Sequence, residues 1–104
     1  MTLETLRNEL DITWDDPKTN LKLSDILRRA QSTLNEYAGE EIDFTDVTTW
    51  EAQLLLDCCR YMWNHAFEDF ETNFRSQLIT LRAKRQVRDY AASQSDAETE
   101  DTGL

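Results

Sequence analysis

The chain has 104 residues, a formal net charge of −10 and 39% hydrophobic residues, among them three Trp, four Phe and three Tyr. This length predicts one small domain, and the low content of two Gly and one Pro favours helices over a turn-rich sheet. No stretch approaches the roughly 18 apolar residues of a membrane span and the start lacks a secretory pattern, so we expect an all-α, small helical bundle with no membrane partner.

The first helix is predicted from Leu3, Leu6 and Leu10, which recur at helical spacing after Thr2, a residue type that caps helix starts. The next residues, Ile12-Thr13-Trp14, favour extended backbone but are too few to form a strand by themselves. We therefore expect a short extended segment that places Trp14 in the core.

The second helix is predicted between Asp16-Pro17, a cap followed by a first-turn proline, and Gly39, which suits the left-handed end of a helix. Its core-facing stripe is Leu23, Ile26, Leu27, Ala30, Leu34, Tyr37 and Ala38. An acidic loop over residues 40–46 follows, and its two large apolar residues, Ile42 and Phe44, are expected to point inward.

A long third helix is predicted to begin at Thr45 or Thr48, because no Gly or Pro interrupts the chain from there to Ser93. A kink or break is allowed between Asn64 and Asn73. Residues 93–104 are polar and acidic with almost nothing to bury, which predicts a disordered acidic C-terminal tail. The expected domains are thus a helical domain over 1–92 and this tail over 93–104.

Two apolar stripes lie about half a turn apart on the predicted third helix. The first consists of Val47, Trp50, Leu54, Cys58 and Tyr61, and the second of Leu56, Trp63, Phe67, Phe70, Phe74, Leu78 and Leu81. A helix that is apolar on opposite faces needs partners on both sides. We expect the first stripe to close the chain's own core and the second to meet another chain, while a second wall of the same core is the alternative.

The charges are unevenly distributed along the chain. Residues 1–74 hold 6 basic and 16 acidic side chains, residues 75–88 hold five basic side chains and no acidic one, and residues 89–104 hold five acidic ones. The acidic body argues against wrapping by nucleic acid, because phosphates would be repelled. The basic block either complements the end of a helix dipole or docks on an acidic neighbour.

The sequence contains no pattern typical of an active site. The single histidine, His65, falls on an apolar stripe, the adjacent Cys58 and Cys59 point in different directions around a helix, and the clustered acids Glu68, Asp69 and Glu71 are expected by chance in so acidic a chain. We therefore expect no enzyme activity, no cofactor and no metal. The two cysteines also favour a reduced, intracellular origin.

Several segments together resemble the head–tail connector proteins of tailed phages, most closely those of siphophages and prophages of Gram-positive bacteria. The resemblance covers roughly residues 2–85 and is carried, in order, by Thr2-Leu3-Glu4 with Leu6 and Leu10, Ile12-Thr13-Trp14-Asp15-Asp16, Leu34-Asn35-Glu36-Tyr37-Ala38-Gly39, Glu41-Ile42-Asp43-Phe44, Leu54 to Tyr61, Asn64 to Phe74, and Leu78 to Leu81. Each motif alone is weak, and it is their order and spacing that is specific. The Cys58-Cys59 pair and the acidic tail depart from the pattern.

The resemblance implies a structural subunit of the virion at the head–tail interface, assembled in the host cytoplasm. Such proteins form a homo-oligomeric ring, typically of about a dozen copies, between the portal protein and the stopper or tail-completion protein, and DNA passes through the channel without sequence-specific binding. It also implies that the C-terminal portion docks on the portal. The expected subunit and portal interface is Trp63, Phe67, Phe70, Phe74, Leu78, Leu81, Arg82, Lys84, Arg85 and Arg88.

Two other classes of protein fit the composition. One is an acidic DNA mimic that occupies a nucleic-acid site on an enzyme or repressor, and the other is a small helical adaptor that binds one cytosolic partner. A DNA mimic requires carboxylates along one face at phosphate-like intervals.

Overall fold

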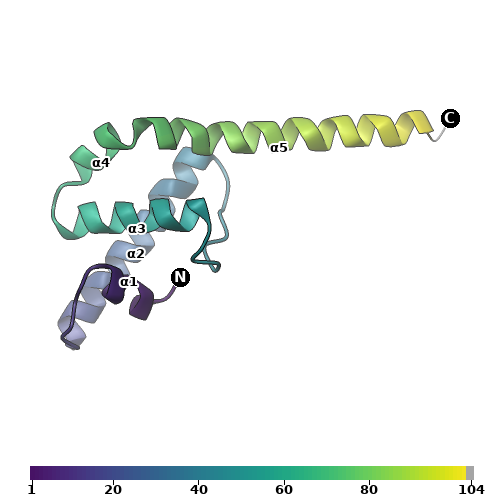
Figure 1. The fold of residues 1–104 in the computed structure, drawn as a ribbon. Helices are drawn as coiled ribbons and strands as arrows, with labels where there is room; N and C mark the ends of the chain where they lie inside the picture. Colours follow the sequence, from purple (N-terminus) through teal and green to yellow (C-terminus); the bar gives the residue numbers. More distant parts are fainter. Residues whose placement is uncertain (103–104) are drawn as a thin grey trace.

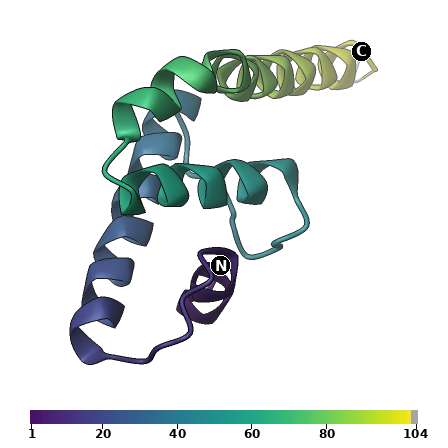
Figure 2. The same ribbon diagram turned by 60° about the vertical axis from the view of Figure 1, so that its left-hand side comes forward.

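The computed structural model describes the backbone of residues 1–102 and the side chains of residues 1–91. Over this part the chain forms α-helices and no strand, which confirms the predicted all-α class. The elements are α1 (Leu3–Glu9), α2 (Pro17–Ala38), α3 (Trp50–Trp63), α4 (Phe67–Asn73) and α5 (Arg75–Thr102). Figures 1 and 2 show a compact body of α1 to α4 with α5 running across one side and extending well beyond it. The principal extents are 64 × 26 × 19 Å.

The first three helices begin at side-chain caps. The Oγ1 of Thr2, a carboxylate oxygen of Asp16 and the Oγ1 of Thr49 each accept a hydrogen bond from the backbone N–H three residues later. Gly39 ends α2 at φ 74°, in the left-handed region that a side chain disfavours. The predicted bounds of the first two helices are confirmed, because caps are local signals.

The third helix begins later than either predicted start. Thr45 and Thr48 each donate both the backbone N–H and the hydroxyl to the carboxylate of an aspartate two residues earlier, Asp43 and Asp46 respectively. These hydrogen bonds hold the segment in tight turns that compete with helix. The helix therefore starts only after Thr49.

Helices α2 and α3 form the centre of the body. Helix α2 contacts α1, α3 and α5, and α3 also contacts α1 and α4. Helix α3 is buried on most sides, through Ala52, Leu54, Leu55, Leu56, Cys58 and Cys59. In the loop before it, Phe44 is buried and Ile42 is half-buried against the core, so both point inward as predicted.

The chain reverses direction between α3 and α4. Asn64 ends α3, and His65 adopts φ 56°, which turns the backbone sharply. Figure 1 shows α5 running back in the direction opposite to α3. The helical segment from Thr49 onward is therefore not one helix but three, and the break falls within the predicted interval.

This reversal corrects the interpretation of the two stripes. Leu54 and Cys58 of the first stripe and Leu56, Phe70 and Leu78 of the second all belong to a single buried cluster. The faces lie on opposite sides of a straight helix, but the fold-back brings α4 and α5 onto the body. The second stripe is the other wall of the chain's own core, which was the alternative interpretation.

The segment between α1 and α2, residues 10–16, is called the α1–α2 linker below. Ile12 is buried there, but Trp14 is 51% exposed, so the prediction that Trp14 enters the core is wrong. Its indole N–H instead donates to the Oγ1 of Thr19 at 3.1 Å, and Arg7 donates to its carbonyl oxygen. These hydrogen bonds hold the ring on the surface, beside the first turn of α2.

Helix α5 continues to Thr102, further than the sequence predicts. The side chains beyond residue 91 lie outside the described residues. The division into a helical domain over 1–92 and a disordered tail over 93–104 stays a prediction.

Candidate interaction surface

Three of the aromatic residues predicted as an interface, Phe67, Phe70 and Phe74, lie in one cluster between α3, α4 and α5. The rings of Phe70 and Phe74 stack with centroids 4.9 Å apart, and Tyr61 meets Phe74 edge-on at 5.7 Å. Phe67 stacks on Phe70 at 6.0 Å. Such ring pairs contribute beyond their area of burial, so this cluster fixes α4 against α3.

Burial shows which predicted interface residues are closed to a partner. Phe70, Leu78 and Leu81 are buried within the single chain, so the prediction that they meet another chain is wrong. Trp63, Phe67 and Phe74 are half-buried and pack against the same core. The sequence pattern identified apolar residues correctly, but periodicity alone does not tell which face the chain itself covers.

The predicted basic residues lie on the surface of α5, and two of them contact the body. Lys84 Nζ lies 3.3 Å from a carboxylate oxygen of Glu51 and 4.3 Å from the ring centroid of Trp50. Arg88 pairs with Glu40 at the end of α2. Lys84 and Arg88 thus pair with acidic residues of their own chain and not of a partner, although such exposed pairs add little stability.

The other basic residues occupy different positions. Arg85 lies against Gly39 and forms an ion pair with Asp89 at 3.5 Å. Arg75 and Arg82 are exposed and have no ion-pair partner among the side chains that the structure describes. Their guanidinium groups are therefore available to a partner.

Helix α5 carries an apolar surface that the sequence interpretation missed. Ile79, Val87 and Tyr90 are 62%, 66% and 67% exposed, and Ala83 between them is exposed as well. At about 100° per residue these four side chains lie roughly half a turn from Leu81, which faces the core. We call them the outer face of α5. Their spacing of four, four and three residues was the available signal, but the stronger aromatic stripe beside it masked it.

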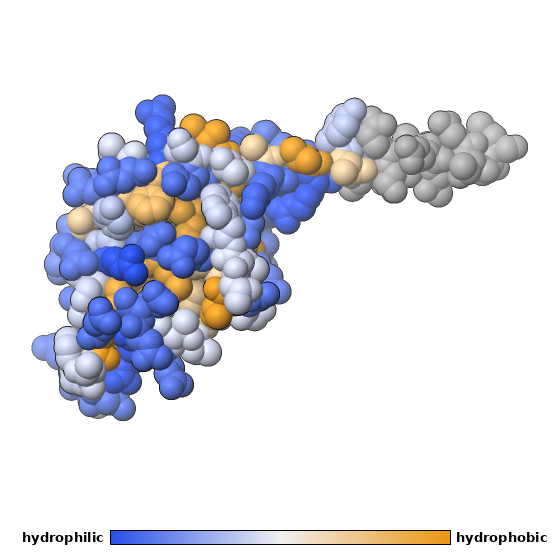
Figure 3. Space-filling model, viewed as in Figure 1, coloured by the Kyte–Doolittle hydropathy of each residue, from blue (hydrophilic) through white to orange (hydrophobic). Residues whose placement is uncertain are grey.

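Figure 3 shows apolar patches along α5, including the part where the helix leaves the body. Exposed apolar residues are ordinary when scattered singly, whereas a row along one helix face marks an interaction surface. Helix α5 therefore has a buried face and an outer face, as the two-stripe argument expected of a long helix, but with different residues outside.

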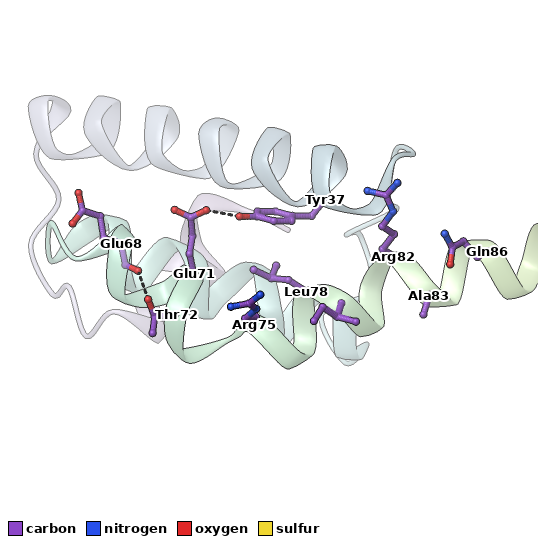
Figure 4. A pocket seen from close by; sticks show the side chains of 10 residues that line it. Tyr37, Glu68, Glu71, Thr72, Arg75, Leu78, Arg82, Ala83 and Gln86 are labelled. Atoms are coloured by element: carbon purple, nitrogen blue, oxygen red, sulfur yellow. Dashed lines mark hydrogen bonds between the residues drawn. The ribbon is translucent and has the colours of Figure 1, made fainter.

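A groove of about 690 Å³ lies beside this face, between α2, α4 and α5. Figure 4 shows it from close by, with acidic side chains at the α4 end and Arg82 toward the α5 end. Leu78, Ile79 and Ala83 supply apolar surface. The residues lining the groove are Tyr37, Glu68, Glu71, Thr72, Arg75, Leu78, Ile79, Arg82, Ala83 and Gln86.

Tyr37 fixes the middle of the groove. Its hydroxyl donates a hydrogen bond to the carboxylate of Glu71, which joins α2 to α4. This hydrogen bond, together with burial, raises the pKa of Tyr37 to about 12. The phenol therefore stays protonated at neutral pH and acts as a positioning group, not as a base.

The titratable residues considered for chemistry are dispersed. Cys58 and Cys59 are buried, and burial raises the pKa of each thiol to about 12, so neither is a reactive thiolate at neutral pH. His65 is exposed at the turn before α4. In the described part of the chain no group of three His, Cys, Asp or Glu side chains is placed to hold a metal ion. Within the same residues no helix is long and apolar enough to span a membrane.

Comparison with family models, with curated proteins and with solved structures finds no match to this chain.

Proposed function

We propose that the chain is a structural subunit of a tailed-phage head–tail connector, which forms a ring between the portal and the stopper or tail. In this role it completes the filled head and extends the channel for DNA, in the virion, and performs no catalysis. The proposal joins the sequence resemblance over roughly residues 2–85 to the surface of α5.

The outer face of α5 is the observation that carries the proposal. A helix whose inner face closes the subunit and whose outer face remains apolar is suited to contacts with another protein. Because α5 also extends beyond the body (Figure 1), this surface reaches away from its own subunit, where a neighbour or the portal can contact it.

The charge distribution also supports a channel subunit. Sixteen of the acidic side chains lie in residues 1–74, and an acidic wall repels DNA phosphates and lets DNA slide. The basic side chains are concentrated on α5, where Lys84 and Arg88 already contact carboxylates of the body. A row of cations on the most prominent helix does not suit a DNA mimic.

The test combines the purified chain with the portal protein encoded in the same genome. We expect electron microscopy to show a ring of this chain stacked coaxially on the portal, with an open central channel. Val87→Asp on the outer face should leave a folded chain that no longer forms this complex, whereas Val47→Asp, a matched change at an exposed valine in the loop before α3, should leave the complex intact.

A chain that remains unbound in the presence of assembled portal rings would overturn the proposal. Recovery of a soluble complex with one cytosolic host protein, without a ring, would instead favour the adaptor alternative.

A further inference from the structure

Two surfaces on opposite sides of the body are complementary in charge and in apolar character. We propose that the α1–α2 linker of one copy, centred on Trp14, docks on the α5 end of the groove in a second copy. This inference rests on the proposed function in one respect, namely that copies of the chain assemble with each other. It adds that the linker of one copy meets the groove of the next copy.

The donor surface is the α1–α2 linker. Trp14 is half-exposed, and Leu21, one turn into α2, is also exposed. Exposed tryptophans are the side chains that most often dominate the binding energy of an interface. The linker holds three acidic residues and no basic one. A carboxylate oxygen of Asp15 lies 3.5 Å from a guanidinium nitrogen of Arg7. Asp11 has no ion-pair partner among the described side chains.

The receiving surface is the half of the groove formed by α5. Ile79 and Ala83 line it, and the small Ala83 leaves room for a large ring. Arg75 and Arg82 stand beside them, seven residues apart, which is about 10 Å along a helix. The carboxylate of Asp11, which has no ion-pair partner among the described side chains, can face these guanidinium groups.

The charges of the groove determine where the linker lies. Glu68 and Glu71 line the α4 end and would repel an acidic segment. In Figure 4 Arg75, the first residue of α5, lies beneath Glu71, whereas Arg82 lies at the end of the groove away from Glu68, so the linker is placed at Arg82.

Charge also selects this arrangement over pairing of two α5 helices. Residues 75–88 carry five basic side chains and no acidic one, so two such segments side by side would repel each other. The linker has the opposite sign. A second copy therefore fits the basic stretch of α5 through its linker and not through the same stretch of its own α5.

The resulting contact is heterologous, because it joins two different surfaces. Figures 1 and 2 place the linker and α5 on opposite sides of the body. Each copy then offers a free linker on one side and a free groove on the other. Head-to-tail contacts of this kind close into a ring when the rotation between copies closes.

The experiment measures self-association of the full chain by sedimentation equilibrium, with circular dichroism as the check on folding. Trp14→Ala removes the tryptophan ring at the centre of the linker. The double variant Arg75→Glu, Arg82→Glu reverses the charge of the receiving surface. We expect each to stay folded and to weaken association by about 30-fold or more, the loss typical of a central interface residue. The matched controls are Val47→Ala and the double variant Arg28→Glu, Arg29→Glu on α2, which should associate like wild type.

Mixing the two defective variants gives the sharper result. The Trp14→Ala chain keeps an intact groove and the doubly charge-reversed chain keeps an intact linker, so their mixture should form a 1:1 dimer and nothing larger. Raised salt should weaken this dimer.

Three outcomes would overturn the inference: a wild-type chain that remains monomeric at its highest soluble concentration, a Trp14→Ala chain that assembles like wild type, or a mixture of the two variants that stays monomeric. If rings still form on the portal with Trp14→Ala, the proposed function stands and this contact is wrong. If the mixture dimerises but the wild-type chain never binds a portal, the contact stands and the proposed function is wrong.

Discussion

Phe70 and Ile79 are large apolar residues on neighbouring helices, and their surroundings differ completely. Phe70 is fully buried and stacks between Phe67 and Phe74, whereas Ile79 is largely exposed on the outer face of α5. Spacing in the sequence identifies both as apolar positions on a helix. It does not distinguish them, because burial depends on where the chain folds back.

Substitution at these two positions should separate core from surface. Phe70→Ala removes a buried ring and is expected to cost about 3–5 kcal/mol of unfolding free energy, while Ile79→Ala should change it by no more than about 0.5 kcal/mol. Urea unfolding followed by circular dichroism measures both. Phe74→Asp, which the two-stripe interpretation would leave folded, should now unfold the chain. Equal losses for Phe70→Ala and Ile79→Ala would contradict this assignment.

The buried thiols make stability depend on pH in the alkaline range. Burial raises the pKa of Cys58 and of Cys59 from 9.0 to about 12. The unfolded chain therefore releases these protons near pH 9, while the folded chain holds them until about pH 12. Folding stability from this source is complete below pH 9 and declines as the pH rises toward 12.

We therefore expect the free energy of unfolding of wild type to fall between pH 8 and pH 10. The double variant Cys58→Ala, Cys59→Ala should be less stable at pH 8 but lose less over the same interval. Urea titrations at fixed pH values provide the comparison. An identical decline in both proteins would show that the thiols do not contribute to it.

At the scale of elements, helix starts and stops are predictable because each depends on a few adjacent residues. The caps at Thr2, Asp16 and Gly39 follow from residue type alone. The start of α3 was predicted too early, since the turns held by Asp43 and Asp46 compete with helix there. The reversal after α3 depends on the backbone of one residue, His65, which no periodicity reveals.

The turn at His65 should respond to the shape of the side chain and not to its imidazole. His65→Gly is expected to leave the free energy of unfolding unchanged or to raise it, because glycine adopts a positive φ without strain. His65→Val should lower it by roughly 1–2 kcal/mol, since a branched side chain disfavours this conformation. Thermal and urea unfolding measure both. A histidine-specific role would appear as equal losses in the two variants.

At the scale of the whole molecule, the predicted all-α class is correct. The long third helix is instead three helices, and the sequence did not predict which apolar residues stay exposed. The predicted interface comprised six apolar residues and four basic ones, Trp63, Phe67, Phe70, Phe74, Leu78, Leu81, Arg82, Lys84, Arg85 and Arg88. The chain buries three of the apolar residues and half-buries the other three in its own core. The exposed apolar surface includes the outer face of α5 and Trp14. Both follow from the fold-back and the linker, which are tertiary features.

The segment over residues 93–104 should contribute little to the stability of the body. It offers almost no apolar side chain for burial, so truncation after Ala92 is expected to change the melting temperature hardly at all. Differential scanning calorimetry of the full and truncated chains tests this. A large decrease would show that the segment packs on the body.

The extended α5 also determines how the molecule moves through solvent. The radius of gyration of the whole chain is 17.4 Å, whereas a compact domain of this length has a radius of gyration of about 13 Å. An elongated particle experiences more friction and tumbles more slowly about its short axes than a sphere of equal mass. A single copy will therefore elute from a sizing column ahead of globular standards of 12.2 kDa. Elution volume alone would then report a monomer as an assembled pair.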